Sequence, residues 1–553
     1  MMAKKTKQSV PGSLRISLYD PGMTPVHRAG LGGLAATLAS IPKRLDLGTW
    51  EVDGDSVTLS WDESPDALLE YIFSRGLRIS EEGIVDFPAL HDRLGSRPSF
   101  EARLLHQEAL MGTMLQHGST RKKGPERRLV LDPDVHSEPK LYEPLLSFKH
   151  QEQAAAITKA LKKKKASYVR IVGSALPGAV ERHPGKSWSR MEVSPAHFLA
   201  LCFALVGSFS FRVRNALYGK ARAFALVTPV VDDLDVFRKL RRKLNNLTSE
   251  QLHVSSASDA ALLVATALNP GVERSKREAY ELFCSVMVFG IQPWAKQQKT
   301  RTQVLYVDQP DDRVLSLYRA AMEIPAFQTK RVKSKDGGYF YAPSLMRAAM
   351  TEAIVEGKPW WQGVAEAFIG ANASTRQKMD YEQRGLREMT QVPDAFDQKY
   401  EKIFVHVCHD AMRQIYGWIH HEFGDLRTST AAQNKARSEI TKIRSSLLRA
   451  KNAETLQDAL LDFWSRAARS KVRANVVLKK KHTIKRKREG SSEEQEAQVP
   501  GWEAILPMLA DDSWRKARNL ALVALLSYSS SHQPDEDDAD ATLDDDSRDE
   551  QES

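Results

Sequence analysis

Glycines and basic residues near the start of the chain suggest phosphate binding. Residues 15–42, RISLYDPGMTPVHRAGLGGLAATLASIP, place Gly30, Gly32 and Gly33 after a strand-like segment and a helix start. A phosphate loop requires G-x-x-x-x-G-K-[ST], and a dinucleotide site requires G-x-G-x-x-G. The segment fits neither pattern. The glycines are therefore predicted to serve close packing, against the strand or a partner subunit.

A second run comes closer to a phosphate loop but also fails. Gly178 stands seven residues before Gly185, which is followed by Lys186 and Ser187, where the loop requires a step of five. Pro184 also removes a backbone N–H at the place where one should donate to a phosphate. We therefore expect no nucleotide cofactor.

The first turn of the helix that begins at Pro25 adds polar residues to the glycine stripe. Thr24 and Pro25 are typical of an N-cap and a first helical position, and His27 and Arg28 follow in the first turn. We expect surface or capping roles for these two side chains. With Gly30 and Gly33 they form a predicted assembly surface, made of His27, Arg28, Gly30 and Gly33.

The histidines and cysteines do not form a metal or catalytic set. His406, Cys408, His409, His420 and His421 gather in one helical stretch, but their spacing differs from that of zinc ligands. The chain has only three cysteines, widely spaced, which suits a reducing cytoplasm. No H-E-x-x-H or G-x-S-x-G motif is present. We therefore expect no metal and no enzyme. The alternative class is a nucleic-acid-dependent enzyme, an NTPase or nuclease, with an unrecognised site.

Basic residues interleaved with aromatic ones carry a stronger signal. Residues 211–224, FRVRNALYGKARAF, have the pattern of two strands joined by a turn. A two-stranded ribbon with arginines on one exposed face suits a nucleic-acid groove. The predicted contacts on this ribbon are Arg212, Arg214, Asn215, Tyr218, Lys220 and Arg222.

Further basic clusters extend this predicted nucleic-acid track. Each cluster alone is typical of a solvated surface, but together they favour phosphate contacts. Their candidate residues are Arg121, Lys122 and Lys123, then Lys162, Lys163 and Lys164, and finally Lys186, Trp188 and Arg190.

The net charge supports an acidic partner for the main part of the chain. The 553 residues sum to +10, but residues 533–553 hold eleven acids and one arginine, so residues 1–532 carry +20. A body this basic is typical of proteins that bind nucleic acid. No segment has the length and apolar character of a signal peptide or a membrane span, so we expect a cytoplasmic protein without a membrane partner.

The elements that must position these residues fall into two regions. Residues 1–343 show alternating strand patterns, such as 14–19 and a hairpin over 49–61, mixed with helical ones. From Ser344 the pattern is helical up to residue 532, interrupted by a flexible basic insert at 479–501. Residues 533–553 are predicted to be a disordered acidic tail. The fold class is α+β, with a mixed α/β N-terminal region followed by a C-terminal helical bundle.

Three segments resemble a known family. Residues 18–38, LYDPGMTPVHRAGLGGLAATL, are similar to the opening signature of the large subunit of type I CRISPR surveillance complexes (Cascade), of the MYXAN subtype. Weaker similarity lies in EGKPWWQGVAEAF (356–368) and SWRKARNLALVALLSY (513–528). The basic insert and the acidic tail match nothing in this family.

The resemblance implies a non-catalytic subunit of an antiviral, crRNA-guided complex. Such a subunit recognises the short motif that flanks the DNA target, helps to open the duplex and stabilises the R-loop. The implied partners are crRNA, target double-stranded DNA, and the backbone, crRNA-end-binding and small subunits, with a helicase-nuclease or transposition proteins acting afterwards. The resemblance also implies an α/β region followed by a helical bundle similar to the small subunit.

Overall fold

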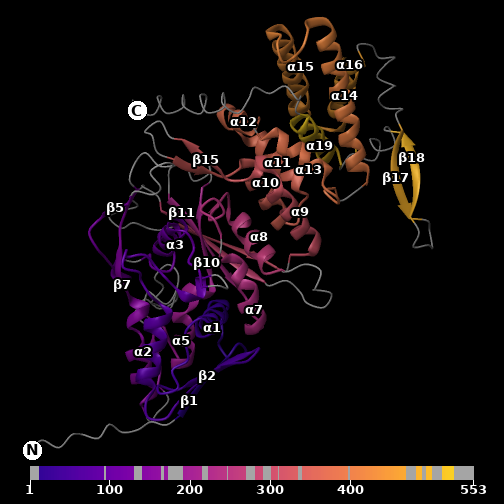
Figure 1. The fold of residues 1–553 in the computed structure, drawn as a ribbon. Coiled ribbons are helices and arrows are strands. Elements are labelled where there is room, and N and C mark those ends of the chain that lie inside the picture. Colours follow the sequence, from indigo (N-terminus) through magenta and orange to yellow (C-terminus); the bar gives the residue numbers. More distant parts are fainter. Residues whose placement is uncertain are drawn as a thin grey trace, which may run out of the picture. The chain divides into compact units, whose positions relative to one another are not determined.

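The computed structural model confirms the α+β fold class (Figure 1). It describes residues 12–91, 95–116, 118–129, 140–163, 167–171, 191–214, 222–245, 247–269, 281–289, 301–308, 310–333, 339–380, 382–396, 399–468, 481–487, 494–500, 508 and 513–528. The chain divides into two compact units. Unit 1 comprises residues 1–315 and 329–343, and unit 2 comprises residues 316–328 and 344–553. The predicted acidic tail lies outside the described residues.

Unit 1 opens with a small antiparallel sheet of order β1-β3-β2, formed by β1 (Gly12–Ser17), β2 (Thr49–Val52) and β3 (Ser56–Trp61). The predicted hairpin is confirmed, and it turns where Asp53 N donates to Ser56 O at 2.9 Å. The register sets Ile16 opposite Val57, and both are fully buried. Alternating apolar residues thus place one face of the sheet in the core.

A five-stranded sheet forms the centre of unit 1, in the order β12-β10-β11-β13-β14. The strands are β10 (Phe209–Val213), β11 (Arg222–Pro229), β12 (His253–Val254), β13 (Leu282–Phe289) and β14 (Arg301–Val307). Strand β12 pairs in parallel with β10, and the other pairs are antiparallel. The 211–224 region is therefore not a free ribbon, because both of its strands have further neighbours in the sheet.

Helices cover this sheet and close the rest of the core. Helix α3 (Phe100–Gly112) packs on β10 and β11, and α8 (Ala257–Ala267) packs on β11 and β13. Helix α1 (Pro25–Leu38) packs on α5 (Pro195–Cys202) and α6 (Ala204–Gly207). The remaining helices of at least two turns are α2 (Pro65–Gly76), α4 (Ala154–Leu161) and α7 (Leu234–Arg241).

Short strand pairs complete the β structure described for unit 1. Strand β4 (Arg121–Lys123) pairs with β7 (Leu145–Phe148), and β5 (Arg127–Leu129) pairs with β6 (Lys140–Tyr142). Two further pairs are β8 (Val169–Arg170) with β9 (Glu192–Val193), and β15 (Lys330–Lys333) with β16 (Tyr339–Ala342). These pairs are too short for residue patterns to reveal them.

Unit 2 is helical in most of its described residues. Its helices are α10 (Leu345–Val355), α11 (Trp360–Gly370), α12 (Ala373–Asp380), α13 (Gln383–Gln391), α14 (Lys399–Phe423), α15 (Thr430–Arg449), α16 (Ala453–Ala468) and α19 (Trp514–Ser527). Most of α9 (Asp312–Glu323) also belongs to this unit. Helix α14 contacts α15, α16 and α19, so the long helix is central to the bundle.

The basic insert differs from its prediction. Strand β17 (Lys481–Lys487) pairs antiparallel with β18 (Glu494–Pro500), where the sequence predicts a flexible segment. The register sets Lys485 opposite Glu496 and Lys487 opposite Glu494. A basic strand beside an acidic one favours this pairing. No helix in the described part of the chain is long and apolar enough to cross a membrane.

Candidate functional site

The glycine stripe of α1 is an internal packing surface of unit 1. A Cβ built on Gly30 would lie 2.1 Å from Ala200 O, and one built on Gly33 would lie 2.3 Å from Phe203 O. Both oxygens belong to the α5–α6 segment of the same chain. The predicted close approach is thus confirmed, but the expected neighbour, a strand or a partner subunit, is corrected: two helix backbones meet here. Gly30 and Gly33 are buried and do not form an assembly surface.

His27 caps α1, as expected from its place in the first turn. Its Nδ1 accepts from the Thr24 backbone N at 3.3 Å and lies 2.7 Å from Thr24 Oγ1. Burial, with a smaller contribution from nearby His197, lowers the pKa of His27 to about 4. A neutral, buried ring is not a phosphate contact. Arg28 instead places its guanidinium 5.5 Å from the ring centroid of Tyr19.

The prediction that the 211–224 ribbon exposes its arginines is wrong for Arg212 and Arg214, which are both half-buried. Arg212 Nη1 forms an ion pair with Glu108 Oε2 of α3 at 2.9 Å, because Arg212 lies on the face of the sheet that α3 covers. Arg214 follows β10, and burial lowers the pKa of its guanidinium, with a further contribution from Arg212. Arg222 begins β11, and its side chain is not described. Asn215, Tyr218 and Lys220 lie outside the described residues.

The cluster at 121–123 is divided between structural and exposed roles. Arg121 donates from Nη1 to the backbone oxygens of Leu115 and Gln116, the latter at 3.0 Å, and burial lowers its pKa. Lys122 is exposed, and exposed Lys123 forms an ion pair with Glu143. Arg121 therefore supports the segment that follows α3, whereas the two lysines lie at the surface.

The run RKKGPERR (121–128) contains two further arginines that are not among the predicted contacts. Arg127 and Arg128 lie on β5 and are exposed. We call Lys122, Lys123, Arg127 and Arg128 together the β4–β5 basic surface. Its signal in the sequence is the density of basic residues around Gly124 and Pro125.

The remaining basic candidates are only partly described. Lys162 is paired with Asp66 at 2.5 Å, and Lys163 is exposed. Lys164, Lys186, Trp188 and Arg190 lie outside the described residues. The structure therefore does not bring the sequence-predicted basic residues together into one described track.

His409 of α14 is a packing residue, whereas His420 and His421 of the same helix are exposed. His409 Nε2 lies 2.8 Å from Ser527 Oγ of α19, and burial lowers the pKa of His409 to about 4. Cys408 is buried, as are Cys202 and Cys284, and burial raises the pKa of each thiol. Among the described residues no group of three or more histidine, cysteine or acidic side chains could hold a metal ion.

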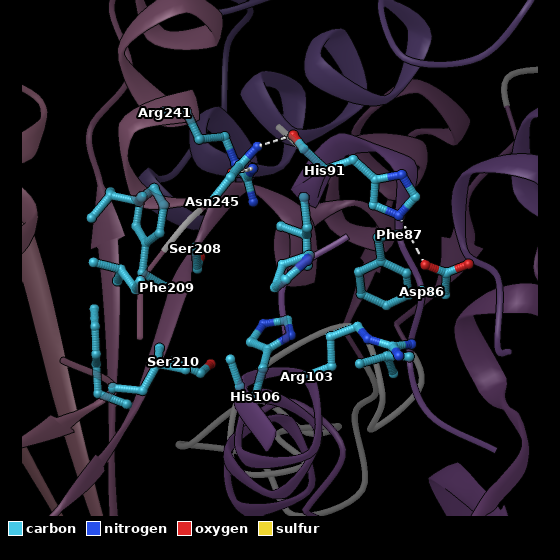
Figure 2. A pocket seen from close by; sticks show the side chains of 18 residues that line it. Asp86, Phe87, His91, Arg103, His106, Ser208, Phe209, Ser210, Arg241 and Asn245 are labelled. Atoms are coloured by element: carbon cyan, nitrogen blue, oxygen red, sulfur yellow. Dashed lines mark hydrogen bonds and ion pairs between the residues drawn. The ribbon is translucent and has the colours of Figure 1, made fainter. Parts of the chain in front are cut away.

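Sequence reasoning missed a pocket in unit 1. It lies between α3, the segment around Phe87, the start of β10 and the end of α7 (Figure 2). Its walls are mostly apolar, and Figure 2 shows Phe209 and Phe87 on opposite sides of it. Polar groups enter from α3, where Arg103 and His106 are one helical turn apart. The pocket joins segments up to 167 residues apart in the chain, from Val85 to Leu252, so no local sequence motif predicts it.

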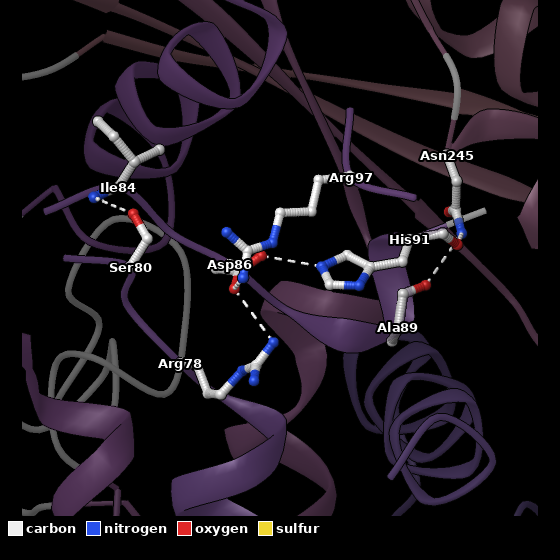
Figure 3. A network of polar contacts seen from close by, with 8 residues as sticks. All are labelled: Arg78, Ser80, Ile84, Asp86, Ala89, His91, Arg97 and Asn245. Carbon is white, nitrogen blue, oxygen red and sulfur yellow. Dashed lines mark hydrogen bonds and ion pairs between the residues drawn. The ribbon is translucent and has the colours of Figure 1, made fainter. Parts of the chain in front are cut away.

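Asp86, which lines the pocket, is fully engaged by basic neighbours. Its carboxylate pairs with Arg78 at 3.1 Å, His91 at 2.8 Å and Arg97 at 3.2 Å, and its side chain is 3% exposed (Figure 3). Asn245 fixes the same segment by donating to Ala89 O at 3.0 Å and His91 O at 2.7 Å. This network holds the pocket wall that carries Phe87.

The back of the pocket holds a buried cation. Arg241 is 2% exposed and donates to Val206 O at 2.9 Å, Ala89 O at 3.0 Å and Asn245 Oδ1 at 3.0 Å. Burial lowers its pKa to about 10, so the guanidinium keeps its charge at neutral pH. Burial, together with Arg241, lowers the pKa of His106 to about 4, which leaves that ring neutral.

Two family models match the chain. The DevT N-terminal domain matches residues 15–202, and the DevT C-terminal domain matches residues 393–553. The first match covers the α1 signature and the second covers α14 to α19. The chain is thus similar to DevT proteins in a segment of its α/β unit and in most of its helical unit.

A curated relative from Myxococcus xanthus (strain DK1622), "CRISPR-associated protein Cas8a1/Csx13", is 30% identical over 556 residues. The alignment covers 94% of this chain and 90% of the relative. The chain therefore belongs to the Cas8a1/Csx13 family of CRISPR-associated proteins. The resemblance to the large subunit of type I CRISPR surveillance complexes, drawn from three sequence segments, is confirmed.

Proposed function

We propose that this chain is the non-catalytic large subunit of a crRNA-guided type I effector complex. In this role it recognises the target-flanking motif in double-stranded DNA and stabilises the R-loop. The observation that carries the proposal is the 30% identity to a Cas8a1/Csx13 protein across 94% of the chain, which includes both units. Its partners are crRNA, target DNA and the other Cascade subunits, in the cytoplasm, with a helicase-nuclease or transposition proteins acting on the bound target.

The β4–β5 basic surface supports contact with DNA by unit 1. Its four side chains are exposed cations, which gain most from phosphate contact because each contact releases counterions. Lys123 pairs with Glu143 and Arg127 donates to Glu81 O, but both remain exposed, whereas Arg212 and Arg121 are half-buried in their contacts. This surface therefore replaces the 211–224 ribbon as the proposed backbone contact. Residues 344–532 are proposed as the part that resembles the small subunit.

Duplex binding by the assembled complex tests the proposal. Changing Lys122, Lys123, Arg127 and Arg128 to Gln should weaken binding and make the salt dependence shallower by up to about four units. A matched variant changes four exposed basic residues on other elements of unit 1: Lys43, Arg75, Lys159 and Lys239. It should keep most of the wild-type slope. Equal slopes for the two variants would show that net charge, and not this surface, drives binding.

Motif recognition and catalysis need separate readouts. Duplexes with matched and mismatched flanking motifs should differ in affinity for the complex, since base contacts specify and phosphate contacts position. The alternative function, an NTPase or nuclease, is tested by incubating the purified chain with ATP and with DNA. Turnover that survives repurification and follows the chain through a size-exclusion column would replace the proposed role by an enzymatic one.

A further inference from the structure

The pocket described above contains polar groups that the fold leaves unused. Arg103 Nε and Nη1 are buried and meet no hydrogen-bond acceptor among the described residues. The residue as a whole is half-buried, but a buried N–H without an acceptor is costly, and the cost is recovered when a ligand supplies one. The Arg103 guanidinium also lies 5.6 Å from the ring centroid of Phe100, a contact that holds the side chain in place.

The charge around the pocket favours an anion. Of its described lining residues, Asp86 supplies the carboxylate, and Arg78, His91 and Arg97 already surround it. Arg103 and Arg241 add two cations, and the partners of Arg241 are neutral oxygens. Glu82, outside the lining, interacts with Arg103 and offsets part of this charge. The lining itself still carries more positive than negative charge.

The walls favour a flat apolar body attached to that anion. Phe87 and Phe209 lie on opposite sides of the pocket in Figure 2, and Leu244, Leu247 and Leu252 complete an apolar lining. The neutral ring of His106 enters the pocket with no hydrogen bond to any described residue, and it offers one donor and one acceptor. A ring with heteroatoms at its edge can use both.

We propose that this pocket binds one nucleotide, with its base against the apolar walls and His106 and its phosphate at Arg103. The inference rests on the proposed function in one respect only, that a nucleic-acid strand is present to supply the nucleotide. The same chemistry is offered by a free mononucleotide and by an unstacked nucleotide of a nucleic-acid strand, and stacking on aromatic walls suits both.

Three variants of the full-length chain test the pocket. Arg103→Gln removes the cation, and Leu247→Trp fills the space from a partly exposed position without changing charge. Arg75→Gln is the matched control, because it removes an exposed arginine outside both the pocket and the β4–β5 basic surface. Thermal unfolding of each variant is compared with that of the wild type. If Leu247→Trp does not fold, Arg103→Gln decides alone.

The probes separate the two sources. The first arm titrates AMP, CMP, GMP and UMP, with adenosine as the phosphate-free comparison. The second arm titrates a ten-nucleotide single strand that carries 2-aminopurine, whose fluorescence reports unstacking. In whichever arm the wild type binds, Arg103→Gln should lower the affinity about 10- to 100-fold, as expected for loss of a hydrogen bond to a charged group. Leu247→Trp should abolish binding, and Arg75→Gln should leave it unchanged in both arms.

Each outcome decides between the proposals. Mononucleotide binding that Arg103→Gln weakens identifies a free mononucleotide as the ligand. If mononucleotides do not bind and Arg103→Gln removes the fluorescence change of the strand, the ligand is a nucleotide within a strand. If neither arm depends on Arg103 or Leu247, the pocket proposal is wrong. That failure leaves the proposed function intact as long as the complex still binds its duplex through the β4–β5 basic surface.

Discussion

Gly33 of α1 and Gly207 of α6 lie directly against each other. A Cβ on Gly33 would come 2.6 Å from Gly207 N, and one on Gly207 would come 3.1 Å from Gly33 N. The neighbours on both sides are backbone atoms, which cannot move aside as a flexible side chain can. The signature that resembles a ligand-binding loop is therefore a helix crossing that fixes the start of unit 1.

Gly33→Ala should destabilise the protein. The added methyl overlaps backbone on α6, and overpacking of this kind costs about 1–3 kcal/mol of the free energy of unfolding. Chemical denaturation of the full chain measures the loss. Gly417→Ala is the control, because it lies in α14 with no atom within 4 Å of the added Cβ. It should stabilise the helix by roughly 0.5–1 kcal/mol. Equal stability of Gly33→Ala and wild type would contradict the crossing.

Lys516→Met should weaken unit 2. Lys516 Nζ lies 2.6 Å from Oε1 of Glu401, a carboxylate with no exposed surface, so the variant leaves a buried negative charge without this cation. The expected cost is roughly 2–3 kcal/mol, below that of a fully buried pair because Lys516 is about one-third exposed. Lys402→Met, at an exposed position beside Glu401, is the control and should change stability little. Similar unfolding curves for both variants would show that the ion pair is unimportant.

His150 should make the protein sensitive to acid. Burial lowers its pKa to about 3, and neither ring nitrogen has a hydrogen-bond partner among the described residues. Since the unfolded state binds the proton first, stability is lost as the pH falls below the unfolded value of about 6.5. The loss between pH 7 and pH 5 should be about 2 kcal/mol.

His150→Phe should remove this part of the pH dependence. Phe keeps an aromatic ring beside Phe148, whose centroid lies 6.0 Å from that of His150. Unfolding free energies at pH 5 and pH 7 should therefore differ less in the variant than in the wild type. His27, His106 and His409, whose pKa values are also lowered, keep their own contributions in both proteins. An unchanged difference would mean that His150 is protonated in the folded state.

Arg212→Gln should affect stability more than DNA affinity. The variant leaves Glu108, which is half-buried, without its ion-pair partner. The unfolding free energy should fall by about 1 kcal/mol, and Glu108→Gln should cause a similar loss. The salt slope for duplex binding should stay at the wild-type value. A slope shallower by one unit with unchanged stability would restore Arg212 to the phosphate contacts.

Deleting residues 533–553 should raise non-specific DNA affinity at low salt. A tail with a net charge of −10 competes with DNA for a body of +20, and screening weakens this competition as salt increases. Filter binding of random-sequence DNA at two salt concentrations measures the effect. If affinity at low salt does not change, the tail acts only on solubility.

Much of the architecture follows from local patterns. The Thr24-Pro25 pair predicts the start of α1 at Pro25, and alternation predicts the hairpin that pairs β2 with β3. The helical pattern after Ser344 is confirmed by α10 to α16 and by α19. Each of these signals depends on residues within one or two turns of each other, so it can be read without knowing the fold.

The exposure of the predicted functional residues could not be predicted from local patterns, because exposure depends on the whole fold. The alternation of β10 puts Arg212 on the opposite face from Val213, as the sequence indicates, but only the fold places α3 on that face and turns a surface cation into a partner of Glu108. The same holds for Arg121, which binds backbone oxygens of the segment that follows α3.

By itself, then, the sequence determined the first hairpin and the main helices, the close approach at Gly30 and Gly33 and the basic character of the body, since each depends on residue type and short-range spacing. Only the tertiary structure decided what approaches those glycines, which cations remain exposed, and that Arg103, His106 and Arg241 meet in one pocket. These outcomes depend on contacts between segments far apart in the chain, which are set by burial of the common core and carry no local pattern.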